Sequence, residues 1–261
     1  MFPNLREKYG AEPVITPKAH SEYRQSKTEG DAVEPPQAVI FCYSNALMRY
    51  FTDIYEGREV SHYYGDLFLF ADTGHSVGVM GNFGIGAPTT AMLMDELIAD
   101  GVEAFLSVGI AGSLDDSIEM GDFILCDKAI RDEGTSHHYV ESEKFAHASE
   151  SFTAKLKELL KNRDETFHVG PSWTTDAIYR ETKAEIERYA DEGVLTVDME
   201  ASAVFAVATH RGVDAGSIFV ISDYLGLSEW EPKFHMTKED LHHLGDTAKE
   251  MLTAYSNRRS I

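Results

Sequence analysis

The stretch 194–224 constrains the fold most strongly, because it reads as a strand, a helix and a second strand in direct succession. A short apolar run at 194–197 leads into the polar turn 198–200, after which apolar residues recur with a helical period. A second apolar run, 217–222, ends on Asp223. In such a β-α-β unit the acidic residues follow the carboxyl ends of two strands. Ligands of open α/β sheets bind at that edge.

The same acidic residues also have a purely structural interpretation. Asp198 is a good N-cap for the helix, and Glu200 in its first turn complements the positive end of the helix dipole. Asp223 can cap a turn. Spacing alone therefore leaves the structural and functional interpretations open, because position in a fold does not establish function.

Strands and helices alternate along most of the chain, which predicts one α/β domain with a mixed sheet over residues 37–261. Residues 1–36 are polar and rich in proline, so we expect an N-terminal arm of loops with little regular structure. Outside the stretch 194–224, strands are expected at 37–42, 59–64, 66–71, 76–81, 104–108, 122–130 and 167–172. Helices are expected at 45–55, from Pro88 to Gly101, and at 151–161, 182–191 and 238–255.

Composition excludes several classes of partner. The 261 residues include 44 acidic and 23 basic side chains, a formal charge of −21, which repels nucleic acids and anionic membranes and suits a high-salt cytosol. No run of 18 apolar residues suggests a membrane span, and the first residues do not resemble a signal peptide. We therefore expect a cytoplasmic protein in which Cys42 and Cys126 are buried, reduced thiols.

The glycine-rich stretch 81–92 joins a strand to a helix. Gly81, Gly84 and Gly86 do not form a dinucleotide fingerprint, because Thr89 stands where its last glycine belongs, and no Walker loop is present. Backbone N–H groups at such a helix start can approach an anion or a sugar. The alternative is a tight strand-to-helix turn without a ligand.

Two further polar stretches are candidates for ligand contacts. His137 and His138 are adjacent, and neighbouring side chains of an extended chain face opposite ways, so a loop histidine near a pocket is favoured over a metal site. Tyr179 and Arg180 suit stacking on and hydrogen bonding to a base. The alternative is that this stretch simply begins a helix.

Four motifs in order identify a resemblance that spans about three-quarters of the chain. They are FGIGAPTTAMLMDEL, LSVGIAGSL followed by MGDFIL, TVDMEASA and VISD. The chain resembles the nucleoside phosphorylases of the purine nucleoside phosphorylase and uridine phosphorylase type, a family that includes methylthioadenosine nucleosidases. The resemblance implies a three-layer α/β/α sandwich around a mixed, twisted, partly barrel-like sheet. It also implies a homodimer that assembles further, to a homohexamer.

The resemblance assigns roles at the sugar and the base. Glu200 matches the acid that holds the ribose hydroxyls, and Met199 matches the methionine that packs against the sugar. Asp198 falls where the family often has another glutamate at the ribose. Asp223 matches the aspartate that donates a proton to the leaving purine. Cleavage of an N-glycosidic bond places positive charge on the sugar and negative charge on the base, so two carboxyl groups suit both ends.

The resemblance also implies a phosphate site, from which this chain departs. Gly84 and Gly86 border the phosphate and ribose, and Arg58 resembles the arginine that reaches the neighbouring subunit's phosphate. Ser107 stands where phosphorylases usually carry an arginine, and Ile110 where they carry a hydroxyl. The first strand leads into CYSNALMR, in which Arg49 is a candidate substitute.

These departures leave hydrolysis by water as an alternative. The stretch CYSNALMR, however, lacks the glutamate that the nucleosidases carry just after the first strand. The VISD motif favours a purine, whereas RDEGTSHHY, with His138, and the Tyr179–Arg180 pair resemble the uridine branch. We therefore predict phosphorolysis of a purine nucleoside to free base and ribose 1-phosphate, with inorganic phosphate as co-substrate and no metal or organic cofactor. Uridine phosphorylase, a nucleosidase and a non-catalytic nucleoside-binding protein are the alternatives.

Overall fold

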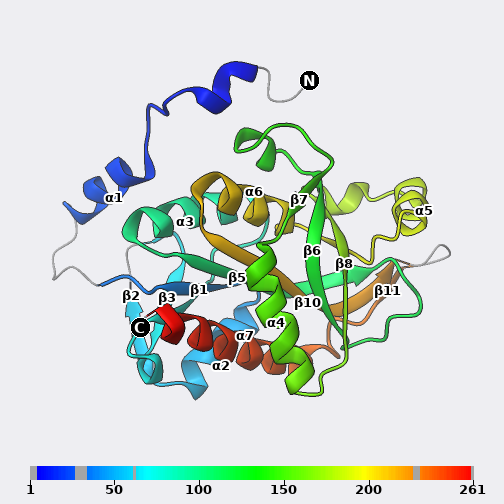
Figure 1. Cartoon of the computed structure of the whole chain (residues 1–261). Helices are drawn as coiled ribbons and strands as arrows, with labels where there is room; N and C mark the ends of the chain where they lie inside the picture. Colours follow the sequence, from blue (N-terminus) through cyan, green and yellow to red (C-terminus); the bar gives the residue numbers. More distant parts are fainter. Residues whose placement is uncertain (1–4, 27–33, 61–62, 226–229, 260–261) are drawn as a thin grey trace.

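A central eleven-stranded sheet organises the computed structural model, which describes residues 5–26, 34–60, 63–225 and 230–259 (Figure 1). The strands are β1 Ala38–Cys42, β2 Gly57–Val60, β3 Asp66–Phe70, β4 Val77–Gly81, β5 Ala104–Ser113, β6 Phe123–Asp132, β7 Phe145–His147, β8 Phe167–Thr175, β9 Thr196–Asp198, β10 Asp214–Leu225 and β11 Trp230–Pro232. Their order is β11-β10-β6-β8-β9-β5-β1-β4-β3-β2, with β7 beside β6. Because β10 also pairs with β5, strands β5, β10, β6, β8 and β9 close into a barrel.

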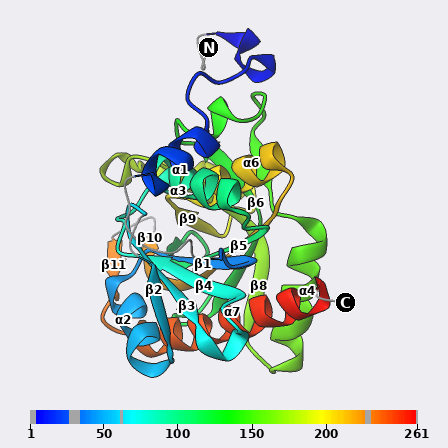
Figure 2. The same ribbon diagram turned by 90° about the vertical axis from the view of Figure 1, so that its left-hand side faces the viewer.

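Helices cover both faces of this sheet. They are α1 Pro17–Gln25, α2 Asn45–Ile54, α3 Ala87–Asp100, α4 Glu150–Asn162, α5 Lys183–Asp191, α6 Ala201–Arg211 and α7 Lys238–Arg259, with short 3₁₀ helices η1 Arg6–Gly10, η2 Ala71–Thr73, η3 Ser136–His138 and η4 Ile178–Arg180. Figure 2 shows α3 and α6 above the sheet, α2 and α7 below it, and α4 at the right beside α7; α4 packs in the same core as α2 and α7. The expected three-layer α/β/α sandwich with a mixed, partly barrel-like sheet is therefore confirmed.

The two helical layers bury separate hydrophobic cores. One core joins α3 and α6 to the sheet through side chains such as Leu97 and Phe205, and the other joins α2, α4 and α7 through Phe51 and Leu252. Cys42 and Cys126 are buried free thiols within these cores, as their apolar surroundings in the sequence indicated.

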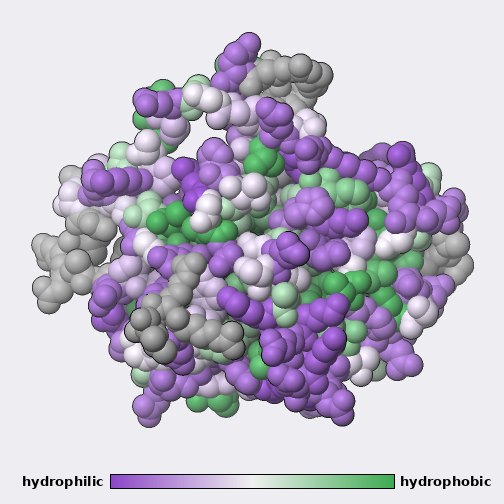
Figure 3. Space-filling model, in the orientation of Figure 1, coloured by the Kyte–Doolittle hydropathy of each residue, from purple (hydrophilic) through white to green (hydrophobic). Residues whose placement is uncertain are grey.

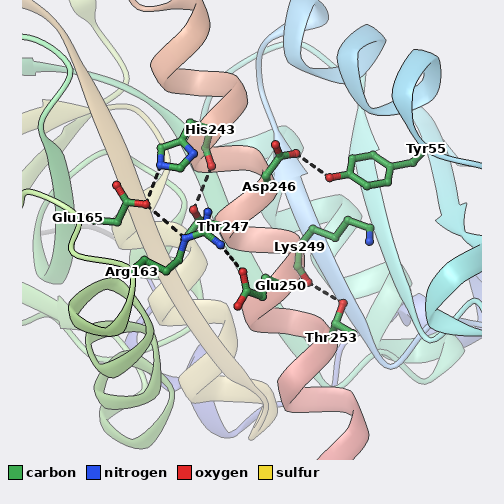
Figure 4. A network of polar contacts seen from close by, with 9 residues as sticks. All are labelled: Tyr55, Arg163, Glu165, His243, Asp246, Thr247, Lys249, Glu250 and Thr253. Carbon is green, nitrogen blue, oxygen red and sulfur yellow. Dashed lines mark hydrogen bonds and ion pairs between the residues drawn. The ribbon is translucent and has the colours of Figure 1, made fainter.

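Helix α7 is also fixed by polar contacts along its surface (Figure 4). His243 contacts Glu165 at 2.6 Å, and Glu250 pairs with Arg163, so the helix is joined to the segment that follows α4. On its other side Asp246 accepts a 2.8 Å hydrogen bond from the Tyr55 hydroxyl, just after α2. No helix in the described ranges is long and apolar enough to cross a bilayer.

The N-terminal region contains regular structure that we did not expect. Instead of loops, residues 5–26 form η1 and α1, and α1 begins where the Thr16 hydroxyl accepts a hydrogen bond from the N–H of Ala19 at 3.1 Å. The Thr16 cap and the proline at the first helical position both favour a helix. The expectation of loops gave more weight to the high proline content of the region. The remainder of the expected arm, 1–4 and 27–33, lies outside the described residues.

Several strands differ in extent from expectation. β5 continues past Val108 through two glycines to Ser113, because it pairs with β10 and then with β9 along that length. The short strands β7 and β11 were not expected, since three residues carry little periodicity. The strand expected at 59–64 ends as β2 at Val60, and residues 61–62 are outside the described part.

Candidate active site

Glu200 lies where β9 passes into α6, and its side chain reaches the loop before α3. Its Oε1 atom accepts a hydrogen bond from the Gly86 N–H at 2.6 Å, and Glu200 is only 7% exposed. Gly86 has φ 105° and Gly84 has φ 89°, a region that favours glycine. The glycine loop and the TVDMEASA motif are therefore joined by a direct contact. Met199, beside Glu200, is half-buried.

The Asp198 carboxylate holds this turn in place through hydrogen bonds. Its Oδ1 atom accepts hydrogen bonds from the N–H groups of Glu200 and Ala201, each at 2.7 Å. Its Oδ2 atom accepts from the Ser172 hydroxyl at 2.5 Å, and the Thr174 hydroxyl contributes a further bond. Asp198 is not the N-cap residue that was expected, although its carboxylate accepts N–H groups at the start of α6. Glu200 occupies the N-cap position itself, one residue earlier than the expected first turn.

Asp223 is positioned by a β-bulge in β10. The pairing of β10 with β5 shifts between Ile221 and Asp223, so that Ser222 is the extra residue and Asp223 lies opposite Gly112. A Cβ atom on Gly112 would approach Leu225 to 2.2 Å and the Asp223 Oδ2 atom to 3.3 Å. The glycine of the GIAGSL motif thus leaves room for the Asp223 carboxyl group.

Pairing on both sides of Gly112 brings the two acidic turns to one end of the barrel. Gly112 lies opposite Asp223 on β10 and opposite Val197 on β9, three residues before Glu200. Adjacent strands are about 4.8 Å apart, so Val197 and Asp223 are separated by roughly 10 Å across β5. That separation is comparable to the length of a nucleoside.

Tyr43 completes the site and was missed by sequence reasoning. It follows β1 directly, its hydroxyl lies 3.2 Å from the hydroxyl of the fully buried Ser107, and its ring packs edge-on against Phe83. Burial and then the charge of Glu200 raise the pKa of Tyr43 well above its ordinary value. The only indication in the sequence that Tyr43 belongs to the site was its position directly after a strand.

The acidic groups of the site perturb one another. Burial, followed by the negative charge of Asp198, raises the pKa of Glu200 to about 8. Burial also raises the pKa of Asp198. At the Asp223 end, burial and then the charge of Asp223 raise the pKa of the half-buried Glu181 to about 7. Carboxyl groups that hold protons near neutral pH are suited to acid–base chemistry.

The two candidate phosphate arginines lie at the surface. Arg49 is on the exposed side of α2, and Arg58 is on the edge strand β2, opposite Leu69 of β3. Within the described part of the chain neither guanidinium group makes a hydrogen bond or ion pair. Ile110, where the resemblance implies a hydroxyl, is 40% exposed on β5.

The candidate base-binding residues lie in two loops. Tyr179 is 96% exposed in η4, Arg180 follows it, and the loop is tied to η3 by the Asp176 carboxylate, which accepts from the Gly134 N–H at 2.8 Å. His138 is exposed, with its Nδ1 atom 2.5 Å from the Lys8 Nζ atom of η1. Burial and the Lys8 charge lower the pKa of His138. The structure thus brings Glu200, Gly86 and Asp223 to one barrel end, while His138 contacts the N-terminal region.

Nothing in the described ranges forms a metal-binding group of three or more His, Cys, Asp or Glu side chains. The sequence profile of the phosphorylase superfamily matches residues 38–257, and the chain belongs to this superfamily. Two of the solved structures that it resembles are an AMP nucleosidase from Bacteroides thetaiotaomicron (TM-score 0.75, 21% identity, 93% of this chain and 100% of that one) and a uridine phosphorylase from Vibrio fischeri (TM-score 0.69, 23% identity, 86% and 91%). At these identities the similarity establishes the fold.

Curated relatives carry names of several nucleoside phosphorylases. The chain is 36% identical over 142 residues to a guanosine phosphorylase of Halorubrum lacusprofundi, covering 54% of this chain and 59% of that protein. It is 30% identical over 151 residues to a uridine phosphorylase of Thermococcus kodakarensis, covering 53% and 54%. A purine nucleoside phosphorylase, DeoD-type, of Bacillus cereus is 29% identical over 194 residues, covering 73% and 74%. The chain therefore spans between half and two-thirds of the first two relatives.

Proposed function

We propose that this protein is a nucleoside phosphorylase, a pentosyltransferase that cleaves a purine nucleoside with phosphate to free base and ribose 1-phosphate. The observation that carries the proposal is the pairing of Asp223 and Val197 on either side of Gly112. This pairing supports the proposal by holding the turns that carry Glu200 and Asp223 at one barrel end, where we propose that Glu200 faces the sugar and Asp223 the base. The names of the relatives support the class of reaction.

In the proposed reaction Glu200 holds the ribose hydroxyls and Met199 packs against the sugar. As the bond to the base breaks, positive charge develops on the sugar ring, which favours the ionised form of Glu200 despite its raised pKa. The bonding electrons leave with the base, and the Asp223 carboxyl donates a proton to it. In this proposal Asp198 acts on the ribose side through the Glu200 backbone that it holds.

The phosphate is proposed to lie at the N-terminal end of α3. Gly84 and Gly86 form the open loop there, and backbone N–H groups with the helix dipole favour an anion. Arg49 and Arg58 are the candidate cationic partners. The exposure of Arg58 on an edge strand suits contact with a second subunit, and we infer a homodimer that assembles to a homohexamer. The reaction needs no metal or organic cofactor, and we place it in the cytoplasm.

Purine is favoured because Asp223 can protonate a purine nitrogen. Tyr179, Arg180 and His138 are proposed to contribute to the base side, with Tyr179 presenting an exposed ring for stacking. Uridine remains the alternative base, since these same loops resemble the uridine branch and a relative bears that name.

Hydrolysis is the second candidate reaction, and the pair formed by Tyr43 and Ser107 favours it. Both are uncharged and their hydroxyl groups are 3.2 Å apart, and Ser107 stands where the resemblance implies an arginine that holds the phosphate. Two hydroxyl groups beside Glu200 suit a water molecule at least as well as an anion. Phosphate dependence therefore separates the two reactions.

The test measures base release from inosine, guanosine, adenosine and uridine in high salt, with and without phosphate. We expect release to require phosphate and to yield ribose 1-phosphate, with a purine nucleoside preferred. Asp223→Asn should lower purine turnover by roughly 10²–10⁴-fold, because the amide cannot donate the acidic proton. Asp116→Asn, at an exposed position, is the matched control and should retain activity.

Equal release without phosphate would identify a nucleosidase, and a preference for uridine would remove the purine assignment. Unchanged purine turnover in Asp223→Asn would remove the proton-donor role. Binding of nucleoside with no release of base by the wild-type protein would identify a non-catalytic nucleoside-binding protein.

A further inference from the structure

A hairpin after the bulge returns a tryptophan to the Asp223 carboxyl group. Strand β11 pairs antiparallel with β10, with Leu225 opposite Trp230 and Asp223 opposite Pro232. The Trp230 indole N–H donates to the Asp223 Oδ2 atom at 2.8 Å, while the Ser222 hydroxyl donates to Oδ1 at 2.7 Å. Both carboxyl oxygens therefore have a donor that fixes their direction. Hydrogen bonds to a carboxylate are among the stronger ones in proteins.

Asp223 and Trp230 differ strongly in their exposure to solvent. Asp223 is 7% exposed, whereas Trp230 is 60% exposed and has Phe234 as its aromatic neighbour, with ring centroids 6.1 Å apart. An indole that is mostly in solvent contributes little to a hydrophobic core. Its N–H group nevertheless donates a hydrogen bond to the buried carboxyl group of Asp223. On the face drawn in Figure 3 most apolar side chains lie in a band across the middle of a largely hydrophilic surface, with smaller apolar patches above and below it.

We propose that Trp230 is a positioning residue for Asp223, whose indole N–H orients the carboxyl group toward the leaving base. This inference rests on the proposed function, because it gives Asp223 the proton-donor role. The proton moves from Asp223 to a base nitrogen, the electrons of the glycosidic bond go to the base, and the carboxyl group is left as an anion. An anionic carboxylate only accepts hydrogen bonds, so the donors on Ser222 and Trp230 stabilise the state formed after transfer.

Charged side chains also lie near Asp223. Glu181 faces it from the segment before α5, and the antiparallel partner strand places Glu231 and Lys233 beside Pro232. The charge of Asp223 adds to burial in raising the pKa of Glu181. Glu181→Gln, which removes this second acid, should leave the effect of Trp230→Phe on kcat in place.

The central variant is Trp230→Phe, which keeps an aromatic ring and removes the donor. In full-length protein we expect a fall in kcat of about tenfold to a hundredfold, the usual effect of losing a hydrogen bond to a charged group. KM for the nucleoside should change by less than kcat, because the lost hydrogen bond matters most when the carboxyl group becomes an anion in the reaction. On an Asp223→Asn background, Trp230→Phe should change kcat little further, since the two residues act as a unit.

Trp173 supplies a matched control, because its indole N–H also donates to a carboxylate, Asp132, at 3.0 Å. Trp173→Phe should leave kcat near the wild-type value. An unchanged kcat in Trp230→Phe would overturn the positioning role. A loss of activity in Trp230→Phe that is equal on the Asp223→Asn background would also overturn it, because the effect would not pass through Asp223.

Failure of the proposed function is distinguishable from failure of this inference. If the wild-type protein releases no base, the proposed function is overturned, and positioning is judged by equilibrium binding of guanosine. Weaker binding in Trp230→Phe that is absent on the Asp223→Asn background then supports an oriented carboxyl group. Equal affinity of wild type and Trp230→Phe overturns it.

Discussion

Glu200 combines a binding contact with an electrostatic cost. Its carboxyl group is buried, lies near a second carboxylate and accepts a backbone N–H from Gly86. Burial is the main cause of its raised pKa and the Asp198 charge is the next. The sugar cation of the proposed reaction would relieve this cost. Where no such charge develops, the raised pKa of Glu200 favours its protonated form near neutral pH.

This proton makes stability depend on pH in a definite direction. The pKa of Glu200 is about 8 in the folded protein, and that of an unfolded glutamate is about 4.3. Between these values the unfolded chain binds fewer protons, so the free energy of unfolding falls as pH rises through this window and the loss ends near pH 8. Below the lower value the contribution is fully present.

Glu200→Gln isolates the effect, because an amide stays neutral and its oxygen still accepts the Gly86 N–H. We expect wild type and variant to have similar free energies of unfolding near pH 4, below the pKa of about 4.3 of an unfolded glutamate. At pH 8 the variant should be more stable by on the order of 4 kcal/mol, from about 1.4 kcal/mol per pKa unit over three units. Urea unfolding at fixed protein concentration measures both. A difference that is the same at every pH would contradict this account.

Single residues also show what the sequence can reveal about a site. Glu200, Gly86 and Asp223 lie in short motifs at the ends of strands, and the contact between Glu200 and Gly86 joins two of those motifs. Tyr43 and Trp230 lie in no motif. They reach the site only because β1 ends beside β5 and because a hairpin reverses the chain. Such contacts depend on tertiary register, which local patterns do not encode.

At the scale of elements, helix α1 shows how local signals can conflict. The hydroxyl cap of Thr16 and the adjacent proline favour a helix, while the neighbouring prolines favour loops. Docking on α3 is the additional favourable interaction. The Arg24 Nη1 atom lies 2.6 Å from the Glu96 Oε2 atom, and the Ser21 hydroxyl donates to Asp100. Glu96 is only 5% exposed, which the helix pattern of α3 alone would not suggest.

The docking contact predicts a local effect of mutation. Arg24→Ala leaves the buried Glu96 without its guanidinium partner, so α1 should separate from α3 more often than in the wild-type protein. We expect amide hydrogen exchange over residues 17–25 to increase at least tenfold, with exchange in β5 unchanged. Arg24→Lys, which keeps the charge, should lie in between. An equal increase in α1 and β5 would indicate global destabilisation instead.

Barrel strands show a second difference between pattern and structure. β5 was expected to stop where its glycines begin, because glycine usually weakens a strand. In the barrel Gly112 makes room for Leu225, which an added Cβ atom would approach to 2.2 Å, and for Asp223 at 3.3 Å, whereas at Gly109 an added Cβ atom would meet Tyr43 at an ordinary contact distance of 3.4 Å. The alternation of elements and their order were predictable, while strand lengths required knowledge of what packs over them.

At the scale of the whole molecule, the buried acidic groups of the site and the exposed acidic groups of the surface should respond differently to salt. The acidic groups of the site are buried and joined by specific hydrogen bonds, so added salt screens them little. Exposed acids such as Asp116, Glu187 and Asp191 are spread along the chain and repel one another through solvent. Their contribution should respond to ionic strength.

The formal charge of −21 therefore predicts that salt stabilises the folded state. Raising KCl from 0.1 to 1 M shortens the Debye length from about 10 Å to about 3 Å, which screens most of the repulsion between exposed acids. We expect Tm to rise on the order of 5 °C, equal to roughly 2 kcal/mol for a domain of this size. The double variant Glu187→Gln, Asp191→Asn should have a higher Tm than wild type at 0.1 M KCl and a smaller gain at 1 M. A gain that is the same in both proteins would show that salt acts by some route other than screening of these charges.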